Sequence, residues 1–318
     1  MSDPNTVIGH NTHRYRVFPD WGNLNPATHP VNDCHEMQLD AQGRIFMLTN
    51  ETRNNILIYD RSGKRLDAWG TEYPGGHGLT LSNENGDEFL FITDIERHQV
   101  IKTTLEGRVV MTIDYPKEIS HYTSAEQFMP TETAIGPTGD IYVTDGYGLQ
   151  YVIQYTPQGE YIRHWGGRGS ANEQFDCVHG IALDTRKPGE PTLLITSRND
   201  NVLKRFTLDG KYLATIPLPG SFVCRPVLHD RFVFAAVFRS TTNRNFGSGY
   251  ITVLDENDRV ISTPGGTEPV YVDGNLQTQF QQQPVFVHPH DVCIDADENV
   301  YVCQWNANKA YPMQLKRV

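Results

Sequence analysis

The sequence predicts an all-β fold, a six-bladed β-propeller, from three observations. Short apolar segments alternate with a period of two residues, as expected for β-strands with one buried face. Tight-turn sequences separate these segments, among them Asp60-Arg61-Ser62-Gly63 and Thr207-Leu208-Asp209-Gly210. Six segments share one outline and recur about every 40 to 50 residues, the period of a four-stranded propeller blade.

Each repeat contains an inner strand, a second strand that ends in Thr-Asp or a variant, a third strand with an aromatic residue, and an outer strand. The predicted second strands cover residues 44–50, 89–94, 140–145, 193–197, 232–237 and 299–303. The predicted blades cover about residues 31–70, 71–115, 125–166, 175–218, 221–263 and 284–318, and the fifth is the most degenerate. Residues 1–318 are therefore expected to form a single propeller domain with an N-terminal lead over residues 1–30.

The ring is predicted to close through the N-terminus. The segment Met313–Val318 is expected to be the third strand of the last blade, and no fourth strand follows it. Tyr15-Arg16-Val17-Phe18 alternates in the required way and supplies that strand. Such closure removes exposed sheet edges.

Composition excludes several kinds of partner. The net charge is −11, and Lys and Arg do not cluster, which opposes binding to nucleic acid or to an anionic membrane. No apolar run approaches the roughly 20 residues that cross a bilayer. The five cysteines lack C-x-x-C spacing and the N-terminus lacks the features of a signal peptide, so a reduced, cytoplasmic protein with a small-molecule substrate is expected. The sequence does not indicate an oligomeric state.

Three histidines open the inner strands of alternate blades: His77 in blade two, His179 in blade four and His290 in blade six. Inner strands line the central channel of a propeller, so alternate blades place the three imidazoles about 120° apart around the axis. Three converging imidazole nitrogens form an open site for Zn²⁺ or another divalent transition metal. One such histidine alone would more simply hydrogen-bond a neighbouring blade, but three in this pattern favour a metal.

Further polar residues are predicted at the same channel. His35 opens blade one and His288 precedes His290 by two residues, so both are candidates for additional metal ligands or for substrate contacts. Glu132 stands beside the start of blade three and is a candidate acid or base. The alternative for Glu132 is a solvated or hydrogen-bonded carboxylate.

Two stretches resemble peptidyl-α-hydroxyglycine α-amidating lyases, which are propellers of the NHL-repeat type. They are Phe91–Val100 and the segment that runs from Val143-Thr144-Asp145-Gly146-Tyr147 to Trp165-Gly166 and is followed by His179. The resemblance extends from about residue 30 to the C-terminus and is weakest across blade five. It implies an NHL-type propeller that cleaves the N–C bond of a carbinolamide and releases a glyoxylate-like product.

The resemblance also implies roles for individual residues. In that family three histidines at these places hold a catalytic zinc, which corresponds to His77, His179 and His290. The tyrosine of the Asp-Gly-Tyr turn is the proposed base, which corresponds to Tyr147. A phenol near a dication can have a lowered pKa and can then take a substrate hydroxyl proton at neutral pH.

The family also carries a structural calcium, bound by the aspartate after the last histidine and by two backbone carbonyls. The corresponding residues are Asp291, Leu79 and Met37.

This chain departs from the family pattern at several positions. Asn50 stands where the family has a catalytic arginine, although Arg53 lies close by. Arg225 and Arg239 of blade five are the other candidates for binding a substrate carboxylate. His288 replaces a family methionine, and the cysteine pairs of the secreted members are absent.

The sequence thus predicts a metal-dependent lyase that acts on a small hydroxylated substrate. Two alternatives are kept: a metal-dependent hydrolase of an ester or lactone, and a non-enzymatic NHL interaction scaffold. Other six-bladed propeller hydrolases usually bind calcium through carboxylate and amide ligands, so three histidines count against the first alternative. A scaffold without chemistry would not explain histidines at alternate blades.

Overall fold

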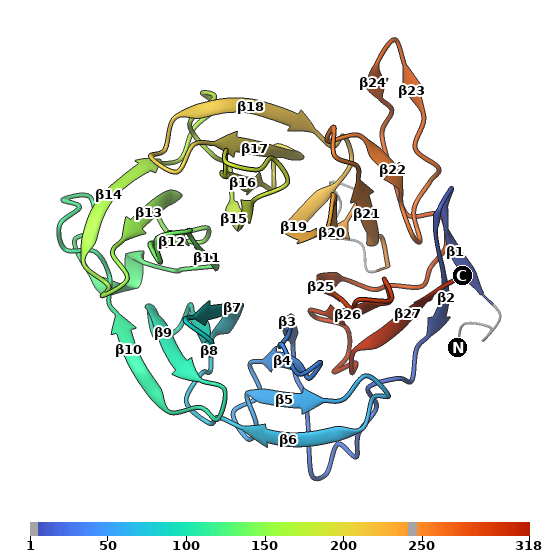
Figure 1. The fold of residues 1–318 in the computed structure, drawn as a ribbon, viewed down its shortest axis with the longest axis horizontal. Coiled ribbons are helices and arrows are strands. Elements are labelled where there is room, and N and C mark those ends of the chain that lie inside the picture. The colour runs from blue at the N-terminus through green and yellow to red at the C-terminus, as the bar shows by residue number, and fades with distance from the viewer. Residues whose placement is uncertain (1–5, 241–246) are drawn as a thin grey trace.

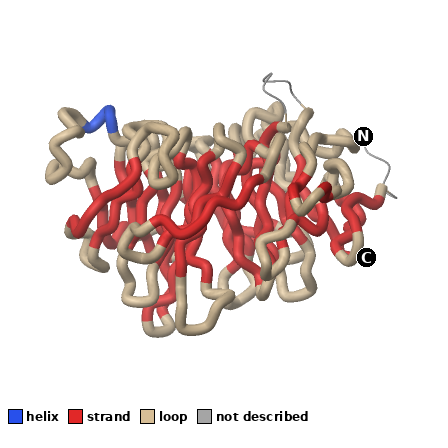
Figure 2. Tube along the Cα trace, turned by 90° about the horizontal axis from the view of Figure 1, so that it is seen from above, coloured by secondary structure: helices blue, strands red, loops and turns tan. Residues whose placement is uncertain are grey.

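The structure is a computed structural model that describes residues 6–240 and 247–318. Six antiparallel β-sheets stand like blades around a central axis (Figure 1). Viewed from the side, the strands form the body of a disc and the loops gather on its two opposite faces (Figure 2). The predicted all-β, six-bladed β-propeller is therefore confirmed.

Five blades are four-stranded sheets whose strands follow the order of the chain from axis to rim. Blade one contains β3 (Cys34–Leu39), β4 (Ile45–Thr49), β5 (Ile56–Tyr59) and β6 (Arg65–Trp69). Blade two contains β7 (Gly76–Glu84), β8 (Asp87–Asp94), β9 (Gln99–Thr104) and β10 (Val109–Ile113). Blade three contains β11 (Glu132–Ile135), β12 (Ile141–Thr144), β13 (Tyr151–Tyr155) and β14 (Tyr161–Gly166). Blade four contains β15 (Val178–Asp184), β16 (Thr192–Ser197), β17 (Val202–Phe206) and β18 (Tyr212–Pro217). Blade five contains β19 (Phe222–His229), β20 (Phe232–Arg239), β21 (Tyr250–Leu254) and β22 (Val260–Ser262).

Blade six joins the two ends of the chain. Its strands are β25 (Pro289–Ile294), β26 (Val300–Gln304) and β27 (Met313–Arg317), followed by β2 (His13–Phe18) and β1 (Val7–His10). Tyr15 pairs with Arg317 and Phe18 with Gln314, which confirms the predicted closure by the N-terminal segment. The fifth strand, β1, was not predicted, and it adds a further antiparallel pair outside β2.

Two small elements lie outside the blades. The hairpin of β23 (Tyr271–Val272) and β24 (Asn275–Leu276) projects from the rim beside blade five (Figure 1). Within the described residues the helical structure is the single turn η1 (Ala125–Gln127) before blade three. No helix in that part of the chain is long and apolar enough to cross a bilayer.

Side-chain hydrogen bonds and glycine residues stabilise the turns of the hairpins. In blade one, the Asp60 carboxylate accepts hydrogen bonds from the backbone N–H groups of Ser62 (2.8 Å) and Lys64 (3.1 Å). Gly63 adopts φ +88°, and a Cβ there would lie 2.0 Å from the carbonyl oxygen of Trp21. Glycine is therefore required at this turn both for its backbone conformation and for the close approach of the N-terminal lead.

The core lies between neighbouring blades. Phe46 and Leu48 of blade one pack with Leu90 and Ile92 of blade two, and all four side chains are fully buried. Each such side chain contributes roughly 1.5–3 kcal/mol relative to an exposed one. All five cysteines are buried and free, as predicted.

A largely buried ion-pair network joins blades four and five. Arg186 lies 2.7 Å from both Asp184 and Asp258, and Arg205 lies 2.6 Å and 2.9 Å from the same two carboxylates. Two arginines therefore balance two aspartates where the side chains have little access to water.

Candidate metal centre at the propeller axis

The three predicted metal ligands meet at the axis. The ring centroids of His77 and His179 are 4.9 Å apart, and each lies 5.1 Å from the centroid of His290. All three side chains are buried. Three histidines that are about a hundred residues apart in the sequence therefore form one cluster, which we call the histidine cluster.

Irregular strand pairing aims these side chains at the axis. The pairing register shifts between Gly76 and Leu79 in β7, between Val178 and Ile181 in β15, and between Pro289 and Asp291 in β25. Each shift spans one of the three histidines. A bulge redirects a side chain that a regular strand would point elsewhere.

Two glycines allow the bulged strands to approach each other closely. A Cβ at Gly78 would lie 2.6 Å from the carbonyl oxygen of Thr131 in the adjoining blade. A Cβ at Gly180 would lie 2.4 Å from the carbonyl oxygen of Cys224. This explains the His-Gly pairs of blades two and four, since no larger residue fits after the histidine.

Backbone carbonyls orient two of the imidazoles. His77 Nδ1 lies 2.8 Å from the carbonyl oxygen of Thr131, and His290 Nδ1 lies 2.9 Å from that of His35. Because a carbonyl oxygen only accepts, Nδ1 carries the proton in both rings, and Nε2 keeps its lone pair for a ligand. Metal-binding histidines are commonly held in this way.

Burial keeps the cluster neutral. It lowers the pKa of His77, His179 and His290 well below the usual value, and neighbouring imidazoles and Arg198 add to the effect. Neutral imidazole is the form that binds a metal ion.

Two more residues extend the set of donor atoms. Two groups of possible ligand atoms converge, each with its three atoms within 4.8 Å of one another. The first group has one ring nitrogen each from His35, His77 and His290, and the second has one ligand atom each from His179, Cys224 and His290. His35 Nδ1 is buried and has no hydrogen-bond partner among the described residues. These donors fit a transition metal such as Zn²⁺, for which imidazole and thiolate are preferred ligands.

Tyr147 reaches the cluster from the turn between β12 and β13. Its hydroxyl lies 3.2 Å from His77 Nε2, 3.1 Å from His179 Nε2 and 3.2 Å from Arg198 Nη2. Burial raises the pKa of Tyr147, and the Arg198 guanidinium opposes that rise. The hydroxyl therefore sits between two imidazole nitrogens and a permanent positive charge.

Asp145 holds the turn that carries Tyr147. Its carboxylate accepts hydrogen bonds from Met129 N (2.7 Å), Leu149 N (2.5 Å) and the Tyr122 hydroxyl (2.5 Å). A Cβ at Gly148 would lie 2.2 Å from that carboxylate. Asp145 and Gly148 of the Asp-Gly-Tyr-Gly sequence thus both have a structural reason.

Arg198 was not predicted as a site residue. It follows β16 at the place where Asn50 follows β4, and its guanidinium lies 4.8 Å from the Phe238 ring and 5.5 Å from the Tyr147 ring. The signal was present in the repeat. The Thr-Asp pair that ends the second strand corresponds to Thr196-Ser197 in blade four, and Arg198 follows it directly, in the loop at the same end of the blade as the turn that carries Tyr147 in blade three.

A cavity of about 560 Å³ opens beside Tyr147 and His290. Its lining contains three arginines and one carboxylate, Asp176, beside aromatic surface, and it includes Tyr147, Arg198, Phe238, Arg239, His288 and Trp305. The Arg239 guanidinium stacks 4.1 Å from the Phe222 ring. His288 lies on this lining, with its ring 5.7 Å from that of Trp305, and it belongs to neither group of converging donor atoms.

The structure does not bring Asn50 and Arg53 to this cavity. Asn50 Oδ1 accepts hydrogen bonds from Asp33 N (2.9 Å) and Asn32 Nδ2 (3.0 Å), so its side chain organises a loop. Arg53 pairs with Glu51 (2.9 Å), and its side chain is 63% exposed. Neither residue lines the cavity.

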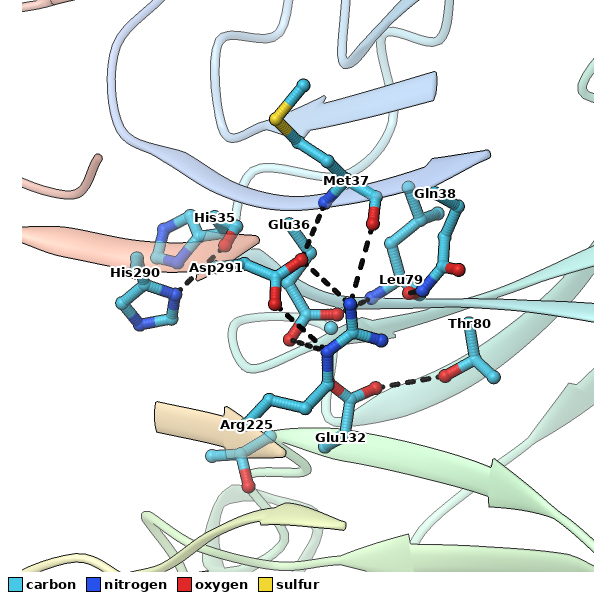
Figure 3. Close-up of polar contacts among 12 residues, drawn as sticks. His35, Glu36, Met37, Gln38, Leu79, Thr80, Glu132, Arg225, His290 and Asp291 are labelled. Carbon is cyan, nitrogen blue, oxygen red and sulfur yellow. Dashed lines mark hydrogen bonds and ion pairs between the residues drawn. The ribbon is translucent and has the colours of Figure 1, made fainter. Parts of the chain in front are cut away.

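Arg225 and Glu132 lie deeper along the axis, among the predicted calcium ligands (Figure 3). Arg225 Nη2 is 2.7 Å from Asp291 Oδ2 and donates to the Met37 carbonyl (3.4 Å), while the Leu79 carbonyl accepts from Gln38 Nε2 (2.5 Å). The Arg225 guanidinium thus lies against Asp291 and the Met37 carbonyl, and the Gln38 amide occupies the Leu79 carbonyl. The arrangement does not fit a calcium ion.

The fold is a six-bladed β-propeller, and comparisons with known proteins find lyase-named relatives at modest identity. No protein-family model matches the chain. It is 25% identical over 280 residues to peptidylglycine alpha-amidating monooxygenase of Rattus norvegicus. The alignment covers 82% of this chain and 25% of that protein. It is 30% identical over 287 residues to peptidyl-alpha-hydroxyglycine alpha-amidating lyase 1 of Drosophila melanogaster, which covers 82% of this chain and 48% of that protein.

The chain thus spans between a quarter and about half of these relatives. It is also 26% identical over 192 residues to NHL repeat-containing protein 3 of Mus musculus, across 51% of this chain and 55% of that one. Its homologues are therefore amidating lyases and NHL-repeat proteins at modest identity, which confirms the resemblance seen in the sequence. A streptogramin B lyase structure shares the fold, with a TM-score of 0.59 and 16% identity over 99% of both chains.

Proposed function

We propose that the chain is a metal-dependent lyase that cleaves the N–C bond of a small carbinolamide. One observation carries the proposal: the Tyr147 hydroxyl lies within 3.2 Å of two imidazole nitrogens and of Arg198, at the wall of a cavity large enough for a small substrate. A proton acceptor, a metal-ligand set and a permanent positive charge therefore face the same space.

His77, His179 and His290 would hold the metal, with His35 as a further candidate ligand. A divalent ion such as Zn²⁺ would supply Lewis acidity at this point. The two Nδ1 hydrogen bonds to backbone carbonyls support the assignment, because they leave the Nε2 lone pairs of His77 and His290 available.

Two arginines would bind and orient the substrate. Arg198 and Arg239 both line the cavity, and each guanidinium lies against the Phe238 ring, at 4.8 Å and 5.2 Å. A planar guanidinium held in this way binds a carboxylate through two hydrogen bonds. A substrate with a carboxylate next to the carbinol carbon would take that position, and the Phe238 and Trp305 rings would exclude water around it.

Tyr147 would move the proton. It takes the proton of the substrate hydroxyl, the oxygen electron pair forms a C=O bond, and the C–N bond breaks. The amide nitrogen receives the electron pair and a proton from Tyr147, so the products are an amide and an aldehyde acid. Neither water nor an oxidant is consumed. Arg198, 3.2 Å away, stabilises the phenolate that takes the first proton and that the second transfer restores.

The test is a product assay on an N-acyl peptide that ends in α-hydroxyglycine. We expect release of glyoxylate and the peptide amide, loss of that activity on chelation and its return with a divalent metal. A peptide that ends in unmodified glycine is the control. Absence of glyoxylate from a protein that contains stoichiometric metal would overturn the proposal, and hydrolysis of esters or lactones by the same preparation would favour the hydrolase alternative.

A further inference from the structure

A second polar cluster lies beneath the histidine cluster. Three carboxylates from three blades, Glu36 on β3, Glu132 on β11 and Asp291 on β25, surround Arg225 on β19 (Figure 3). Arg225 Nε lies 3.7 Å from Glu36 and 3.5 Å from Glu132, and Arg225 Nη2 lies 2.7 Å from Asp291. We call this group the arginine cluster. It links blades one, three, five and six at the axis.

Every member of this cluster is removed from water. The Arg225 side chain is 9% exposed, and the three carboxylate side chains are at most 2% exposed. A buried carboxylate without a compensating cation is strongly unfavourable, so three of them at one point demand a positive charge among them.

The surrounding backbone completes the arrangement. Asp291 Oδ2 accepts from Met37 N (3.0 Å) and Glu36 Oε2 from Leu79 N (2.6 Å). Glu132 Oε1 accepts from the Thr80 hydroxyl at 2.9 Å. The carboxylates are thus held in place by neighbouring blades, with the guanidinium between them.

The same oxygens are a ligand set for a hard dication. Calcium prefers six to eight oxygen ligands from carboxylates and backbone carbonyls. The carboxylates of Glu36, Glu132 and Asp291, with the carbonyls of Met37 and Leu79, would provide such a set if the guanidinium were absent. With Arg225 present, a dication at Asp291 would lie against a fixed positive charge.

We propose that Arg225 is a built-in cation that replaces a structural calcium ion at the axis of this propeller. The chain then needs no calcium for its stability. Removing the guanidinium creates a calcium-binding site from the oxygens that Arg225 now contacts, those of Glu36, Glu132, Asp291 and the Met37 carbonyl. This inference concerns the arginine cluster and is independent of the reaction at the histidine cluster.

The experiment compares the intact protein with Arg225→Ala by calorimetry and differential scanning fluorimetry, in calcium-free buffer and in about 1 mM Ca²⁺, with the same Zn²⁺ concentration in both. The melting temperature of the wild type should differ by less than about 1 °C between the two conditions. Arg225→Ala should melt well below the wild type in calcium-free buffer and regain at least about 3 °C with Ca²⁺. Tb³⁺ luminescence gives an independent measure of binding to the variant.

Matched variants separate calcium binding from general damage. Arg205→Ala also removes an arginine from a buried ion-pair network, but Arg186 still faces the same two aspartates, so calcium should not restore its stability. The double variant Arg225→Ala/Asp291→Asn should lose the calcium response. Arg225→Lys keeps the charge and should be insensitive to calcium.

Three results would overturn the proposal. The first is a stabilising calcium ion in the wild type that Asp291→Asn abolishes. The second is a folded Arg225→Ala protein that binds neither Ca²⁺ nor Tb³⁺. The third is an Arg225→Lys protein that depends on calcium, which decides the matter even where Arg225→Ala does not fold.

Discussion

Tyr147→Phe removes one oxygen atom from the candidate active site. That oxygen lies 3.2 Å from His77 Nε2, 3.1 Å from His179 Nε2 and 3.2 Å from Arg198 Nη2. The ring itself packs edge-on against His77, with centroids 5.2 Å apart, and phenylalanine preserves this contact. The variant therefore isolates the hydroxyl.

We expect a large fall in kcat and only small changes in KM and in the free energy of unfolding. A proton acceptor in the transition state contributes about 10²- to 10⁴-fold, or about 3–5 kcal/mol of barrier. KM should change little because Arg198 and Arg239 remain in the cavity. Loss of a buried hydrogen-bonding group costs about 1–3 kcal/mol of stability, which a domain of this size tolerates.

The assay measures glyoxylate release as a function of pH, together with the metal content of each protein. The rising limb of the kcat/KM profile should disappear in Tyr147→Phe, while the metal stoichiometry stays that of the wild type. Tyr151→Phe is the control, since that hydroxyl contacts His121 (3.2 Å) at an exposed position. A Tyr147→Phe enzyme that keeps kcat within about threefold refutes the role of the base.

Four other outcomes follow from the structure. His290→Ala should lower the bound metal below stoichiometry in elemental analysis, because the imidazole belongs to both groups of converging donor atoms. Arg239→Ala should raise KM about tenfold or more and change kcat little in steady-state kinetics, since it removes a carboxylate partner at the cavity wall. Burial alone would raise the pKa of Asp184, but hydrogen bonds from two arginines outweigh it and lower the pKa to about 2. Asp184→Asn should therefore cost about 2 kcal/mol in urea unfolding at pH 7, and the difference from the wild type should vanish as the pH falls from about 4 to 2. Deletion of residues 1–20 should lower the melting temperature by about 5 °C or more, because it removes three fully buried hydrophobic side chains and exposes the edge of β27; an unchanged transition would contradict the closure argument.

The fold could be predicted from the sequence because each blade repeats the same alternation and turn chemistry. The closing strand followed from the same logic, since Tyr15 and Val17 alternate with exposed residues as a strand with one buried face requires. The added strand β1 could not be predicted, because Val7–His10 alternates weakly and its pairing depends on the position of β2.

The site was predicted in part. Histidines at alternate blades indicated their meeting at the axis, because that conclusion needs only the blade order. The positions of the arginine side chains were harder to predict. Asn50 and Arg53 stand at the start of a blade-one loop, and only the structure shows that Asp33 and Glu51 hold them away from the cavity. Arg225 lies in a strand whose pairing register shifts between Val223 and Pro226, so alternation alone could not say which way it points.

Those register shifts also explain why two different clusters stack at one axis. In a regular strand consecutive side chains point to opposite faces, so an inward His290 would leave Asp291 outside the channel. The shift between Pro289 and Asp291 lets His290 join the histidine cluster and Asp291 join the arginine cluster. His35 and Glu36 repeat the arrangement, with a shift between Cys34 and Glu36.

The inner strand of blade three, β11, has no such register shift, and it supports this reasoning. Within the described residues, β11 pairs with β12 without a register shift, and it contributes only Glu132 to the arginine cluster and no ligand to the histidine cluster. A strand that obeys the two-residue period supplies one axial group at this level, whereas the bulged strands β3 and β25 each supply two. In the bulged strands β7 and β15 a glycine follows the histidine. The repeat therefore specifies the propeller, and the departures from it at the start of each bulged inner strand specify its chemistry.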